Sequence, residues 1–130
     1  MYIFIKKLCK IVVLIIFLGF IPSSVFAIDN DNWIKVQKQI YGEQEWNKTS
    51  VEVLEQKKLS VLTRFLSNSK NEKKYNGEQY YLMNIDCDKG KYKDLKVNGS
   101  IKEYATWETP KNDKLITDII DQSCNYAFPN

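Results

Sequence analysis

The sequence predicts an α+β domain: an antiparallel β-sheet of about five to six strands, with one C-terminal helix packed on a face and tied by a disulfide. Three observations predict it. Several segments alternate apolar and polar residues with the period of a strand. Turn-forming pairs such as Asn98-Gly99 separate these segments. The last segment has apolar residues at helical spacing and contains a cysteine, so strands precede one helix.

The N-terminal half of this domain predicts three strands and a polar loop. Each strand is a run of alternating or β-branched residues, and turn-forming or polar residues separate the runs. In chain order, the predicted elements are a strand over 34–40, a turn at Gly42, an interrupted strand of Trp46 and 50–54, a strand over 59–66, and a loop over 67–74.

The C-terminal half predicts two hairpins and the helix. A strand over 79–87 is followed by a turn at 88–90, a return strand over 92–97, the Asn98-Gly99 turn and a strand over 100–104. Pro110 then precedes the helix, and Asn112 or Asp113 can cap its first turn. The helix has one apolar stripe, made of Leu115, Ile116, Ile119, Ile120 and Cys124.

The first 27 residues have the three parts of a secretory signal peptide. A stretch with three lysines precedes an uncharged apolar run over 11–21, and residues 25–27 match a signal peptidase site. We expect cleavage after Ala27, which leaves one domain over residues 28–130 with no membrane span. An uncleaved anchor is the alternative, but the apolar run is shorter than the roughly 20 residues of a spanning helix.

The charge of the mature domain restricts its partners. The chain has 19 Lys and Arg against 16 Asp and Glu, and the expected leader removes three lysines and no acid. The mature domain is therefore neutral. Nucleic acids and anionic membranes attract basic surfaces, so neither is expected as a partner.

The three cysteines are Cys9, Cys87 and Cys124. Cys9 precedes the apolar run and should leave with the leader, so no lipid anchor is predicted. In a small exported domain the other two most simply form a disulfide, and two free thiols or pairing between chains are the alternatives. Cys87 lies on an apolar strand face and Cys124 on the helical stripe, so the bridge would pin the helix to the sheet. It would stabilise the fold by roughly 4 kcal/mol in the chain-entropy model.

The residue types argue against catalysis. There is no histidine, which excludes Ser-His-Asp and Cys-His mechanisms and the usual zinc sites. We therefore predict no catalytic residue, no metal, no cofactor and no enzymatic activity.

The aromatic residues are the best candidates for a binding surface. Three Trp and eight Tyr are many for 130 residues, and aromatics on exposed sheet faces often dominate binding. Filling a small core is the alternative role. We take Tyr80, on the strand face opposite Cys87, and Trp46 as candidate binding aromatics, and we expect Trp107 in the core.

The C-terminal half resembles the surface-adhesin protein E family. The family pattern has a strand ending in Asp-Cys, a following Tyr-containing strand, a Trp and a Pro, and a helix that closes on a second Cys. The matching segments are Tyr80–Gly90 (YYLMNIDCDKG), Lys91-Tyr92-Lys93, Trp107-Glu108-Thr109-Pro110 and Cys124, with Asp86, Cys87, Tyr92, Trp107, Pro110 and Cys124 at the family positions. The N-terminal half matches more loosely, through Trp33, Ser50-Val51 and the strand from Leu59 to Arg64.

This resemblance implies an antiparallel sheet with a C-terminal helix tied to it by the cysteine bridge. It also implies a role, because named members bind host extracellular-matrix and plasma proteins at the bacterial surface. The named adhesin resembles a lipoprotein, whereas this chain has no cysteine directly after its leader. No ligand-binding motif of the family can be matched here residue by residue.

We therefore expect an exported, non-enzymatic binding or adhesion module that is periplasmic, secreted or at the cell surface. Its partner would be a protein, either a host matrix or plasma protein or a protein of the cell's own envelope. A periplasmic structural or accessory domain that contacts envelope proteins is the alternative, and a small enzyme inhibitor is less favoured. The sequence is also compatible with a homodimer.

Overall fold

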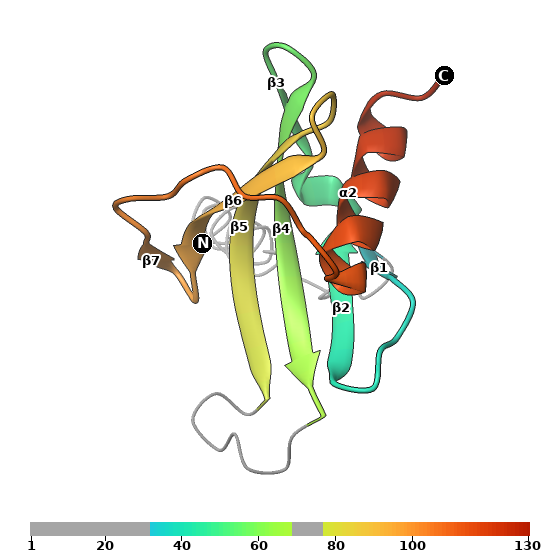
Figure 1. Cartoon of the computed structure of the whole chain (residues 1–130), viewed down its shortest axis with the longest axis vertical. Coiled ribbons are helices and arrows are strands. Elements are labelled where there is room, and N and C mark those ends of the chain that lie inside the picture. Colours follow the sequence, from blue (N-terminus) through green and yellow to red (C-terminus); the bar gives the residue numbers. More distant parts are fainter. Residues whose placement is uncertain (1–31, 69–76) are drawn as a thin grey trace, which may run out of the picture.

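A computed structural model describes residues 32–68 and 77–130 of the chain (Figure 1). The expected leader lies outside these residues, as does most of the loop expected over 67–74. The described elements, in chain order, are β1 (Trp33–Lys35), β2 (Gly42–Asn47), the 3-10 helix η2 (Lys48–Ser50), β3 (Glu52–Leu54), β4 (Lys58–Ser67), β5 (Glu78–Asp86), β6 (Lys91–Val97), β7 (Ser100–Ile101) and the helix α2 (Lys114–Ala127).

Seven strands of the described chain form one antiparallel sheet, in the order β1-β2-β4-β5-β6-β7, with β3 paired to β4. Helix α2 packs on one face of this sheet, chiefly against β2 and β4 (Figure 1). The predicted α+β class and the single C-terminal helix are therefore confirmed. None of the helices in these residues is long and apolar enough to cross a membrane.

The core lies between α2 and the sheet because the strands alternate as predicted. One face of β4 and β5 buries apolar side chains, and the apolar stripe of α2 covers them. The buried apolar residues are Val36, Trp46, Leu59, Val61, Met83, Ile85, Leu115, Ile119 and Ile120. Asp113 caps the helix, since its carboxylate accepts a hydrogen bond from the Ile116 amide at 3.1 Å.

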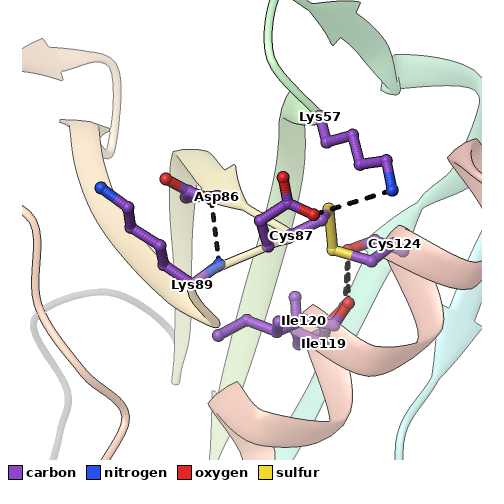
Figure 2. Close-up of a disulfide and its surroundings, with 9 residues drawn as sticks. Lys57, Asp86, Cys87, Lys89, Ile119, Ile120 and Cys124 are labelled. Atoms are coloured by element: carbon purple, nitrogen blue, oxygen red, sulfur yellow. Dashed lines mark hydrogen bonds and ion pairs between the residues drawn. A yellow bond between two sulfur atoms is a disulfide. The ribbon is translucent and has the colours of Figure 1, made fainter.

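The disulfide between Cys87 and Cys124 is present, and its Cα atoms are 5.7 Å apart (Figure 2). Cys87 directly follows β5, and Cys124 lies in the second half of α2. The predicted pairing within one chain is thus confirmed, and it ties the C-terminal half of α2 to the sheet. Beside it, the Lys89 amide donates to the Asp86 carboxylate at 3.1 Å, which stabilises the turn into β6.

The predicted first strand is too long, and Gly42 has a different role from the one expected. β1 ends at Lys35, and Ile40 lies in a two-residue turn with 94% of its surface exposed. Gly42 belongs to β2 rather than to the turn. A Cβ atom built on it would lie 2.5 Å from the Phe65 ring, so glycine is required there for close packing between strands.

The other differences are also local. The predicted interrupted strand is two strands, because the Asn47 side chain accepts bonds from the amides of Thr49 and Ser50 and starts η2 between them. The strand predicted over 100–104 ends at Ile101. The Asn98-Gly99 turn itself is confirmed, since both residues have positive φ angles, of 50° and 81°.

Candidate binding pocket at the start of the helix

A cavity of about 260 Å³ lies between the first turn of α2 and the sheet. Residues from α2, from four strands and from the turn before β2 line it. They comprise four aromatic residues (Tyr41, Phe65, Tyr81, Tyr92), two carboxylates (Asp94, Asp113) and four others (Gln44, Met83, Leu115, Ile116). We call this cavity the helix-start pocket.

Strand register brings the aromatic side chains together. Phe65 on β4 lies two residues from Thr63, which is opposite Tyr81 on β5, so all three face the helix side of the sheet. Tyr92 on β6 is opposite Ile85, whose side chain is in the core. Tyr41, 48% exposed, stands at the rim.

Strand alternation on β6 places an acid in this pocket. Asp94 is opposite Met83 on β5, in the regular part of the pairing that ends before the register shifts between Met83 and Leu82. Asp94 therefore lies on the same face as Tyr92, two residues earlier, and points toward the helix side. In the parts of the chain that the structure describes, no hydrogen bond or ion pair to the Asp94 carboxylate is found, so this acid is open to a ligand.

The segment between β7 and α2 adds a second carboxylate beside Tyr92. Glu108 exchanges two backbone hydrogen bonds with Tyr92, of 3.0 and 2.8 Å, which holds this segment against β6. The Tyr92 hydroxyl also donates to the Glu108 carboxylate at 3.4 Å. At the rim, the Tyr41 hydroxyl lies 3.5 Å from the Asp113 carboxylate.

The pocket has a negative electrostatic character. Burial raises the pKa of Asp94, and the charge of Glu108 raises it further, while Lys102 opposes the shift. Burial also raises the pKa of Tyr92, to about 12, with further contributions from Glu108, Asp94 and Asp113. Burial and the Asp113 charge raise the pKa of Tyr41 in the same direction. All three shifts disfavour further negative charge here.

The floor of the pocket is polar but satisfied. Gln44 is buried, and its amide donates to the Thr63 hydroxyl at 3.5 Å. That hydroxyl in turn donates to the Met83 sulfur at 3.4 Å. This chain of weak bonds accounts for the buried polar groups, so the floor is a fixed surface.

The structure separates the two aromatic residues that the sequence proposed for binding. Tyr80 lies on the sheet face away from the helix, partly buried, with its ring 6.2 Å from that of Trp33. Trp46 is only 3% exposed, and its indole donates to Gln122 of α2 at 3.0 Å. The expectation that Trp46 offers its ring to a partner was wrong, because the ring faces the helix and fills the core.

Trp107 is the reverse case. The sequence predicted it in the core, but it is 37% exposed in the segment that leads to α2. The Lys93 ammonium lies 4.8 Å from its ring centroid on the outer side. The segment follows the edge of the sheet without entering the core, so this prediction is corrected.

Sequence reasoning did not single out Asp94 as a site residue. The available signal was the alternation in the return strand, which predicts that Asp94 shares a face with Tyr92. The strand β5 against which Asp94 pairs, and the helix turn that covers this face, are contributed by residues distant in the sequence.

The fold and the pocket define a small disulfide-bonded α+β domain with an open cavity beside its helix. A family model described as the Surface adhesin-E family matches residues 34–130, so the chain belongs to that family. The resemblance inferred from the sequence is thereby confirmed. Searches of curated proteins and of solved structures found no match. The family suggests an adhesion module that binds proteins, and together with the disulfide it suggests an exported or surface protein.

Proposed function

We propose that the chain is an exported, non-enzymatic module that binds a protein partner through its folded domain. The observation that carries this proposal is the family match over residues 34–130, joined to a disulfide that holds the helix on the sheet. Disulfides form and persist in oxidising compartments outside the cytosol, which supports export. In this proposal, cleavage after Ala27 releases the domain 28–130.

The partner is either a host matrix or plasma protein or a protein of the cell's own envelope. The position of Cys9, ahead of the apolar run, favours the second source, because a lipidated cysteine would follow that run. We therefore keep a periplasmic accessory domain as the second candidate.

Two measurements test this proposal. Mass spectrometry of the exported protein under non-reducing conditions should give the mass of residues 28–130 less two hydrogens. A retained leader would contradict the export step, and two free thiols would contradict the disulfide.

Crosslinking in intact cells should then capture a defined protein partner, and fractionation of the crosslinked cells should show the compartment in which it is recovered. Matched crosslinking with Cys87→Ser/Cys124→Ser separates binding by the folded domain from non-specific capture. Recovery only in the periplasm, with an envelope partner, would select the accessory domain over the host adhesin. No partner above the level of this control would overturn the binding module.

A further inference from the structure

The helix-start pocket has the chemistry of a cation site. Its lining contains four aromatic rings and two carboxylates, and no lysine or arginine among the described residues. The face of an aromatic ring attracts a cation, most strongly where water is excluded. A carboxylate beside such rings adds a direct charge partner. An anionic ligand in this pocket would be repelled by both Asp94 and Asp113, so the lining disfavours it.

The size of the pocket limits the ligand to one side chain. Sites for drug-sized ligands have volumes of about 300–1,000 Å³. The helix-start pocket, at about 260 Å³, is smaller. It suits the end of a lysine or arginine, whose apolar stem can contact rings while its charge reaches the carboxylate.

The rim favours a cation carried on a protein. Ile40 and Tyr41 form the exposed turn beside the pocket, with 94% and 48% of their surfaces exposed. Where a side chain of one protein anchors in a pocket of another, the surrounding contacts exclude water from it, and exposed apolar residues beside the pocket can make such contacts. A free amine would gain nothing from this rim.

Asp94 is the residue that most needs such a ligand. Its carboxylate loses hydration in the pocket and has no hydrogen-bond donor in the described chain. Lys102 is the cation that opposes the raised pKa of Asp94 most directly, yet it forms no ion pair with Asp94 within 4.0 Å in those residues. A bound cation would supply the missing partner.

We propose that the helix-start pocket receives a lysine or arginine side chain of the protein partner, with its charge beside Asp94 and its stem against the aromatic rings. This rests on the proposed function and deepens it, because it states the chemistry by which the partner is recognised.

The test is an NMR titration of the purified exported protein with the tripeptide amide acetyl-Ala-Lys-Ala and its arginine counterpart. Saturable shifts should appear at pocket residues, with a dissociation constant on the order of 1 mM. The same peptide with Nε-acetyl-lysine, which lacks the charge, should bind at least about tenfold more weakly.

Two variants sharpen the test. Asp94→Asn should weaken binding of the lysine peptide by about tenfold, and Tyr41→Leu, at the exposed rim, by a few fold. Asp88→Asn is the matched control, because it removes one carboxylate next to the disulfide, and its affinity should be unchanged.

Equal binding of the charged and acetylated peptides, or unchanged affinity in Asp94→Asn, would overturn the proposal. Tighter binding of cadaverine than of the lysine peptide would overturn the protein source of the cation. Crosslinking keeps the two proposals separate. A partner captured equally by wild type and Asp94→Asn would contradict the role of the pocket but support the binding module. Peptide binding without a captured partner would support the pocket but contradict the binding module.

Discussion

Glu45 and Asp94 are carboxylates on two strands of the same sheet, but they have opposite surroundings. Glu45 on β2 faces away from the helix and is 2% exposed, and the Arg64 side chain donates a hydrogen bond to it. The Lys35 ammonium lies 3.8 Å from its other oxygen. Asp94 on β6 faces the helix and has no such partner in the described residues.

The difference follows from register. Glu45 lies directly opposite Arg64 across the β2–β4 pair, and Lys35 lies opposite Glu45 across β1–β2. The Arg64 guanidinium is also stacked 4.3 Å from the Trp33 ring centroid. Asp94, by contrast, lies opposite the apolar Met83 and lines a cavity. A buried charge that is paired serves the fold, whereas one left open at a cavity is available for binding.

The largest effect should come from breaking the paired carboxylate. Arg64→Met leaves Glu45 buried with only the exposed Lys35 ammonium at 3.8 Å, so the free energy of unfolding should fall by about 3 kcal/mol. Urea denaturation followed by tryptophan fluorescence measures this loss. Glu45→Gln combined with Arg64→Met should recover at least half of it. A loss in the single variant no larger than in the double would show that the pairing is unimportant.

Removing the carboxylate of Asp94, which is unpaired within the described part of the chain, should increase the stability of the protein. Asp94→Asn keeps the shape and eliminates a desolvated charge, so the free energy of unfolding should rise by about 1 kcal/mol. The same urea experiment measures it, with Asp88→Asn as a control that should stay within about 0.5 kcal/mol of wild type. A destabilised Asp94→Asn protein would mean that the carboxylate already has a partner.

The pH dependence should sharpen the comparison further. The pKa of Asp94 is raised above its ordinary value of 3.8 in the folded protein, so the native state binds more protons than the unfolded state just above that pH. The contribution of Asp94 to stability is therefore fully present below its ordinary pKa and is lost as the pH rises through the raised value. The charged groups that act on the pKa of Asp94 are Lys102, which lowers it, and Glu108, which raises it, and Tyr92 and Asp113 also line the pocket.

Thermal unfolding of wild type and Asp94→Asn at a series of pH values measures this effect. The difference in Tm should be close to zero at the most acidic pH and widen in favour of the variant toward neutral pH. Parallel curves for the two proteins would contradict the assignment.

The smallest change in stability should come from removing the Trp33 ring that stacks on Arg64. Trp33→Leu removes the cation–π contact but leaves the ion pair with Glu45, so the loss should be about 0.5 kcal/mol beyond that of a control leucine substitution at Tyr104. Chemical denaturation again provides the measurement. A loss as large as that of Arg64→Met would indicate that the stacking, and not the charge pairing, holds Arg64.

Most of the fold was predictable because its signals are local. The Asn98-Gly99 turn, the Asp113 cap and the stripe that carries Cys124 each depend on neighbours within a few residues. The strand β2 was missed because residues 42–45 read Gly-Glu-Gln-Glu, a poor strand former. Its side chains are buried because β2 lies between β1 and β4 in the sheet and α2 packs on it.

The candidate pocket was much less predictable. Trp46 was expected at a binding surface but lies in the core, because α2 packs on β2 and covers it. Trp107 was expected in the core but lies at the surface, in the segment before α2. Residue type alone did not distinguish an aromatic in the core from one at the edge.

The sequence by itself determined the alternation of strand and turn, the amphipathic helix and the two cysteines available for a bridge, since periodicity and cysteine number are properties of the chain. Only the tertiary structure decided which carboxylate is paired and which is open. That choice depends on strand register and on where the helix begins over the sheet. These are long-range contacts, and the disulfide that holds the far half of the helix leaves its first turn over a cavity.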